Sequence, residues 1–337
     1  VRANMIRNCP VTIDDINRAE KIWGKDVSAL KGKTVKKKPT PVTRDIVKVP
    51  KEFMKLHNEV MISIDIFFVN KIAFFLLLSR VIYYTGTSHL ADRKVGTIFK
   101  AFKEIFVFYL RRGFHIVDVN ADGEFEPLKQ LIEALPSAPT VNLAAKSEHV
   151  ADIERRIRVV KERARAARSR LPFRRIPELL TIWIVFQSVR MLNYFPSKGG
   201  VSSTLSPTTI MSGEVLDYNR QLKLQVGQYC QVYEEDQPRN SQLPRTKGAI
   251  ALGPTGNVQG GFRFMALNTG KRITRYSWDA LPMPDTVIDR VNKLGKDQPE
   301  HFIFTDRHGN LIGDVATPGP EPEYPDLLED GIADAPA

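Results

Sequence analysis

The most apolar segment of the chain, Val60–Gly86, constrains the fold more than any other feature. If it were a membrane-spanning helix, it would have to bury the charged side chains of Asp65, Lys71 and Arg80, at a few kcal/mol each. Strands joined by turns account for the pattern better, because the segment is rich in β-branched and aromatic residues. We therefore predict three consecutive strands, over Val60–Val69, Ile72–Ser79 and Val81–Gly86.

Beyond this segment, helical and strand-like periodicities alternate along the chain. A hairpin followed by alternating helices and strands implies an α/β fold with a mixed sheet, in which helical crossovers add parallel strands. The crossover rule places the fourth strand beside the first. The elements that we predict here are a helix over Val95–Leu110, a strand over Phe114–Val119, a helix over Glu126–Ala134, a strand over Thr140–Ala144 and a helix over Asp152–Arg175.

Further elements are expected before and after the mixed sheet in the sequence. A capped helix over Thr12–Trp23 opens the chain, and an amphipathic helix over Glu178–Asn193 follows the sheet. The pattern then changes to short strands between glycine-rich turns, which is typical of a small β-barrel. The strands predicted for it are Gly227–Val232, Thr246–Leu252, Gly260–Asn268 and Lys271–Ser277, and one last hairpin is expected over His301–Ile312.

Charge is distributed unevenly along the chain. The formal net charge is +11, but Asp314–Ala337 contains seven acidic side chains and no basic one, so the rest carries +18. A body this basic indicates a polyanionic partner, either nucleic acid or an anionic membrane surface. The lysine run Lys31–Lys38 is expected to be a solvated linker, with phosphate contacts or a nuclear import signal as alternatives. The acidic tail is expected to be disordered, as a connector or as a competitor for the bound nucleic acid.

Three carboxylates indicate a metal site. Asp65 lies in the middle of the first predicted strand, where a charge is costly unless it is paired or bound to a cation. Asp122 lies just past the fourth strand, where parallel strands place functional groups. Glu154 enters from the start of the Asp152–Arg175 helix. Carboxylates converging from these three places form an oxygen-only site for hard divalent cations, which can support phosphoryl displacement.

The predicted helix that carries Glu154 is strongly basic. Its buried stripe is expected to consist of Ile153, Ile157, Val160 and Ala164. Arg158 and Lys161 follow Glu154 by one and two turns, share its face, and are expected to be exposed. The residues that we expect to hold a nucleic-acid backbone are Arg155, Arg158, Lys161 and Arg165. The alternative is a solvated helix in which Glu154 pairs with Arg158.

Three stretches of the sequence carry a family resemblance. They are Asp65-Ile-Phe-Phe-Val-Asn-Lys, Asn120-Ala-Asp-Gly-Glu-Phe-Glu and Glu154-Arg-Arg-Ile-Arg. Together they resemble the integrase of copia-type retrotransposons. The resemblance implies a ribonuclease H-like core with an Asp, Asp, Glu triad, which maps onto Asp65, Asp122 and Glu154. Asp118 is the competitor for the second position, and Glu148 for the third.

The same resemblance implies an activity, a cofactor and partners. The chain would join element DNA to target DNA by strand transfer, with Mg²⁺ or Mn²⁺ held by the triad, and would act as a homo-oligomer without a membrane partner. Two other classes stay open: a non-catalytic nucleic-acid-binding remnant, and a ribonuclease H-like nuclease, which the three carboxylates alone do not exclude. Because the chain begins at Val1 and not with a methionine, we expect it to be either a fragment or a processed piece of something larger, such as a polyprotein.

We expect six segments in this chain. They are 1–50, a helical and basic linker region without the family's zinc module; 51–195, the ribonuclease H-like catalytic core; 196–221, a linker; 222–285, the small β-barrel; 286–313, a C-terminal extension; and 314–337, the acidic tail. Cys9 and Cys230 are the only cysteines, so no disulfide framework is expected. An intracellular location, in the nucleus or cytoplasm, fits this cysteine usage.

Overall fold

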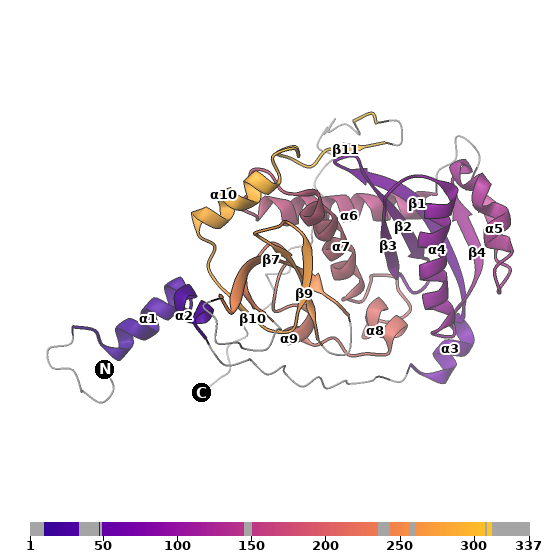
Figure 1. Ribbon diagram of the computed structural model, residues 1–337. Helices are drawn as coiled ribbons and strands as arrows, with labels where there is room; N and C mark the ends of the chain where they lie inside the picture. The colour runs from indigo at the N-terminus through magenta and orange to yellow at the C-terminus, as the bar shows by residue number, and fades with distance from the viewer. Residues whose placement is uncertain are drawn as a thin grey trace, which may run out of the picture.

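Figure 1 shows the computed structural model, which describes residues 10–33, 47, 49–144, 150–234, 243–256, 260–306 and 309–311. Within these residues the chain forms a six-stranded mixed sheet and a five-stranded antiparallel sheet. Several sequence-based predictions fall outside the described residues. They are those made for Cys9, for Glu148, for most of Lys31–Lys38, for the tip of the His301–Ile312 hairpin and for the acidic tail.

The mixed sheet has the strand order β3-β2-β1-β4-β5, and the short strand β11 is added beside β1. β1 is antiparallel to β2 and parallel to β4, as the crossover rule predicts. This antiparallel portion extended by parallel strands is the ribonuclease H-like arrangement, so the predicted α/β fold class is confirmed. The bounds are β1 (Glu59–Val69), β2 (Ile72–Ser79), β3 (Thr85–Leu90), β4 (His115–Ala121), β5 (Thr140–Leu143) and β11 (Phe304–Thr305).

Helices cover both faces of the mixed sheet (Figure 1). One face packs against α4 (Val95–Leu110), with α3 (Lys51–His57), the 3₁₀ helix η1 (Gly123–Leu128) and α5 (Lys129–Glu133) beside it. The other face packs against α6 (Ala151–Ser169) and α7 (Glu178–Asn193). Along β1, Ile62 and Ile64 face α4, while Phe67 and Val69 face α6. The period of two therefore puts Asp65 on the α6 face.

The second sheet is antiparallel throughout, with the order β10-β6-β7-β8-β9. It curls strongly, because the Trp278 ring of β10 lies 5.4 Å from that of Phe262 and 5.6 Å from that of Phe264 in β8, measured between centroids. The predicted all-β region is thus present as a curled sheet. Its strands are β6 (Tyr229–Tyr233), β7 (Thr246–Pro254), β8 (Phe262–Ala266), β9 (Arg272–Arg275) and β10 (Trp278–Ala280).

The remaining helices connect or brace the two sheets. The N-terminal pair, α1 (Ile13–Trp23) and α2 (Val27–Lys31), lies beside the curled sheet (Figure 1), where Lys25 pairs with Asp279 of β10 at 2.7 Å. α8 (Pro207–Ser212) and α9 (Tyr218–Gln221) lie between α7 and β6 in the chain, and α10 (Asp285–Leu294) follows β10. No helix of the described residues combines the length and the apolar character needed to cross a membrane.

The predicted third strand, Val81–Gly86, is wrong in its position. The chain turns here, because the Tyr83 N–H donates to the Ser79 carbonyl at 3.0 Å and the Tyr84 N–H to the Ser79 hydroxyl at 3.1 Å. Tyr83 has a φ of 59°, which a strand cannot contain. The apolar Ile82 that suggested a strand is buried in the core within this turn, and β3 follows it.

Two helix limits also differ from the prediction. The helix expected over Glu126–Ala134 starts earlier, as η1, directly after Asp122. The basic helix expected to continue to Arg175 ends at Ser169 as α6. Pro172 explains this early end, because a proline and the residue before it disfavour the helical conformation.

Candidate active site

Pairing between β1 and β4 brings two of the predicted carboxylates to the same level. The last paired residues of the two strands are Ser63 and Asn120. Asp65 and Asp122 each follow two residues later, and Asp122 keeps an extended backbone with φ −74° and ψ 162°. Since side chains of extended chains alternate, both carboxylates lie on the face that α6 covers. Asp118 pairs with Met61 instead, further back along the strands.

The carboxyl group of Asp65 has a strongly shifted pKa. Burial raises the pKa of its carboxyl group to about 7, against a hydrogen bond that the Ile66 N–H donates to Oδ1 at 2.6 Å. The negative charges of Asp122, Glu124 and Glu154 raise this pKa further. Asp118 is not among the charges that act on it. The charges that act on Asp65 are therefore those of Asp122, Glu124 and Glu154.

Glu124 is an acid that the sequence pattern did not single out. It lies in η1, and its Oε2 lies 3.5 Å from Nη2 of Arg93. The guanidinium of Arg93 in turn lies 5.6 Å from the ring centroid of Phe68 on β1. In the sequence, Glu124 stood out only as part of the stretch Asn120-Ala-Asp-Gly-Glu-Phe-Glu, which carries the family resemblance. Its charge acts on Asp65.

α6 crosses the sheet face that carries Asp65, and its predicted buried stripe is confirmed, with Ile153, Ile157, Val160 and Ala164 all buried. Glu154 and Arg158 are exposed. Lys161 was expected to be exposed too, but it is half-buried, and burial lowers its pKa. The charge of Asp65 acts in the opposite direction, so the ammonium and this carboxylate lie close enough to interact.

Lys161 lies against the C-terminal strand β11. It pairs with the end of β1, on the side that β4 leaves free after Ser63. The Lys161 Nζ and the Arg165 guanidinium lie 5.6 and 4.8 Å from the ring centroid of Phe304 in β11. One aromatic ring thus holds two cations of α6 that are one helical turn apart. Asn70 fixes the approach of β11, since its Oδ1 accepts the Ile303 N–H at 2.8 Å.

Arg155, which we expected to hold a nucleic-acid backbone, does not share the flank of Glu154. It lines a pocket on the opposite flank of α6, together with Arg156 and Arg163. The helical period explains this, because positions 154, 158, 161 and 165 share one flank, whereas a shift of one residue turns a side chain by about 100°. Of the four predicted basic residues, three therefore share the flank of Glu154.

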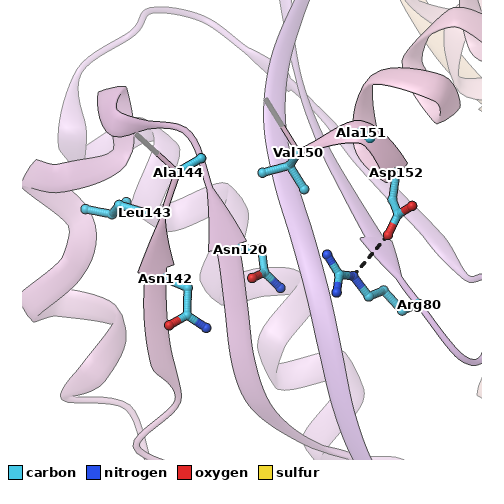
Figure 2. A pocket seen from close by; sticks show the side chains of 8 residues that line it. All are labelled: Arg80, Asn120, Asn142, Leu143, Ala144, Val150, Ala151 and Asp152. Atoms are coloured by element: carbon cyan, nitrogen blue, oxygen red, sulfur yellow. Dashed lines mark ion pairs between the residues drawn. The ribbon is translucent and has the colours of Figure 1, made fainter. Parts of the chain in front are cut away.

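A cavity of about 510 Å³ opens beside the carboxyl ends of β4 and β5 (Figure 2). The amide side chains of Asn120 and Asn142 line it, and Nδ2 of Asn120 donates to the Ile62 carbonyl at 3.3 Å. At its other wall, Nε of Arg80 lies 3.1 Å from Oδ2 of Asp152. Asp65 and the three acids whose charges act on it are not among the residues that line this cavity.

The donors around Asp65 fit a hard divalent cation in their chemistry, because all of them are carboxylate oxygens. A bound cation would also offset the burial and, to a smaller extent, the repulsion that raise the pKa of Asp65. In the part of the chain that the structure describes, however, no three His, Cys, Asp or Glu side chains are grouped as a ready metal site. The carboxylates thus lie near one another without forming a complete ligand shell.

No protein-family model matches the sequence, and no curated protein matches it. Among solved structures, the catalytic core domain of BIV integrase is 13% identical, with a TM-score of 0.34 over 45% of this chain and 92% of that chain. The HTLV-2 integrase catalytic core domain in complex with magnesium is 12% identical, with a TM-score of 0.35 over 46% and 97%. A simian T-cell lymphotropic virus intasome in complex with PP2A regulatory subunit B56 gamma is 10% identical, with a TM-score of 0.37 over 82% and 93%. Similarity this low says nothing about the chemistry of this chain.

Proposed function

We propose that this chain is a retrotransposon integrase segment, which joins element DNA to target DNA by metal-dependent strand transfer. Asp65 supports this proposal most strongly. It is a carboxyl group in the middle of a core strand, and three other acids act on it. Such an arrangement costs folding free energy, and an apolar residue would serve the strand better. The copia-type resemblance of the sequence points to the same residues.

Each residue near Asp65 has a proposed role. Asp65 and Asp122 would bridge the divalent ions, and Glu154 would complete the shell of one of them. When bound, such ions activate the attacking hydroxyl and stabilise the leaving oxygen of a phosphoryl displacement. Lys161, which interacts with Asp65, would hold the phosphate backbone together with Arg158. In this proposal the catalytic core spans 51–195, and 222–285 is an accessory β domain.

A second candidate function is DNA binding without chemistry. One observation favours it: the described residues contain no group of three side chains ready to hold a metal ion. Such a remnant would keep the cations of α6 and bind DNA, but would not join strands. An assay of strand joining therefore separates the two candidates.

Asp122→Asn should slow DNA joining by about ten- to a hundredfold in Mg²⁺. The change removes one carboxylate at the level of Asp65, while Glu124 remains as an oxygen donor and limits the loss. The rate is measured from joined products of labelled oligonucleotide duplexes on a denaturing gel.

Asp118→Asn is the matched control for this prediction. It makes the same change within β4, at the level of Met61 and four residues before Asp122, and should leave the rate unchanged. Equal losses from both variants would contradict the assignment of Asp122 as the ligand.

Replacing Arg158 and Lys161 together with Ala should weaken binding to all duplex sequences alike, since phosphate contacts carry no base information. The loss of two phosphate contacts should flatten the slope of log affinity against log salt by about two units. Fluorescence anisotropy over a salt series measures this slope.

The control for this pair is Lys100→Ala with Lys103→Ala, two exposed lysines of α4 on the opposite face of the sheet. This control should keep the original salt slope. If the Arg158 and Lys161 variant keeps it as well, the DNA does not run along this flank of α6. Thermal melting of each variant checks that Lys161, which is half-buried, is not needed for folding.

A further inference from the structure

The flank of α6 that faces away from Asp65 lines a second basic site. A pocket of about 490 Å³ lies there, between α6, the turn before β3 and the loop after α7. Its described lining contains one acidic residue, Asp152, which pairs with Arg80 at 3.1 Å. The cationic lining residues are Arg80, Arg155, Arg156, Arg163 and Lys198.

The positive charges at this pocket outnumber the negative ones. Among the described residues, Asp152 is the only carboxylate at the pocket, and it faces Arg80. The half-buried guanidinium of Arg156 lies 5.7 Å from the ring centroid of Tyr83. Burial lowers the pKa of Arg156, and the charge of Arg163 acts in the same direction. Like charges held together in this way form a site for an anion.

The rest of the lining is apolar and aromatic. Met191, Leu192 and Pro196 form part of the wall, and Tyr83 and Phe195 supply rings. Phe195 is 53% exposed, so part of its ring is open to a ligand. Aromatic faces next to cations are the combination by which proteins hold unpaired nucleotides, with the base on a ring and the phosphate on the charges.

We propose that this pocket binds an unpaired, phosphate-bearing nucleotide of a DNA strand, with Phe195 stacking on the base and Arg163 and Lys198 contacting phosphates. The ion pair of Arg80 and Asp152 lines both this pocket and the cavity at the ends of β4 and β5 (Figure 2). A strand that runs through this cavity would therefore enter the basic pocket next. This binding goes beyond the proposed strand transfer, because it does not require the carboxylates to act.

The test measures binding of two labelled single strands by fluorescence anisotropy: oligo-dT, and an abasic strand of equal length that has the phosphates without the bases. Phe195→Ala should weaken binding of oligo-dT about fivefold or more and leave the abasic strand unchanged. Arg163→Ala with Lys198→Ala should weaken both strands and flatten the salt slope by roughly 1.4 units.

The Lys100→Ala and Lys103→Ala variant again serves as the control, and it should bind both strands as the unchanged protein does. Binding of single strands is measured without any joining step, so failure of this site is distinguishable from failure of the proposed function. The proposal is overturned if Phe195→Ala affects the two strands equally or not at all. It is also overturned if the Arg163 and Lys198 variant has no more effect than the lysine control.

Discussion

Asp65→Asn should abolish DNA joining while leaving DNA binding intact. The amide keeps the size of the carboxyl group but carries no charge to offer a divalent cation, and it no longer repels phosphates. The rate of joining should fall by more than about a hundredfold, because even loss of a group that only supports a metal ligand costs up to that much. The dissociation constant for duplex DNA should be unchanged or lower, measured by anisotropy on the same preparation.

Loss of binding together with joining would contradict this account of Asp65. The carboxyl group would then hold the fold together, although its raised pKa indicates an unfavourable position. A melting curve of the variant distinguishes the cases, because a structural role predicts a lower Tm and the present account predicts a higher one.

The same substitution should stabilise the metal-free protein at pH 8. The pKa of Asp65 is about 7 in the folded chain and has an ordinary value of 3.8, so between these values the folded state keeps a proton that the unfolded state has lost. The free energy of unfolding should therefore fall as the pH rises from about 4 to 7, by about 1.4 kcal/mol per pH unit. Above pH 7 the penalty stays at its full value of a few kcal/mol.

Asp65→Asn removes this titration. Its Tm should match that of the unchanged protein at pH 4 and lie several degrees above it at pH 8. Asp118→Asn is again the matched control, and it should keep the original pH dependence. Added Mg²⁺ should raise the Tm of the unchanged protein at pH 8 but not that of Asp65→Asn. A decline of stability with pH that is equal in both proteins would rule out Asp65 as its source.

Local patterns predicted the parts of the fold that local forces decide. The limits of β2, α4 and α7 agree with the sequence periodicity. β3 could not be placed in this way, because the buried Ile82 has the composition of a strand but lies in a turn whose hydrogen bonds converge on Ser79. An apolar residue indicates that its position is buried. Whether the backbone there forms a strand or a turn depends on contacts with the rest of the fold.

In the candidate site, too, some features could be predicted from local sequence patterns and others could not. The crossover rule predicted from the sequence that β4 lies beside β1. It therefore also predicted that Asp65 and Asp122 lie on neighbouring strands or directly after them. The covering of Lys161 by Phe304 had no local signal, because the segment of β11 meets Asn70 across 233 residues of chain. Arg155 differs from both cases, because the helical period alone turns its side chain about 100° away from that of Glu154.

Metal-dependent strand joining by the unchanged protein is the most direct test of the proposed function. Labelled element-end duplexes and target DNA are incubated with the full chain in Mg²⁺, in Mn²⁺ and in EDTA, and joined products are counted on a denaturing gel. We expect joined products with either ion, none in EDTA, and none with Asp65→Asn under any condition. DNA binding without joined products in both ions, or joining that continues in EDTA, would contradict the proposed function.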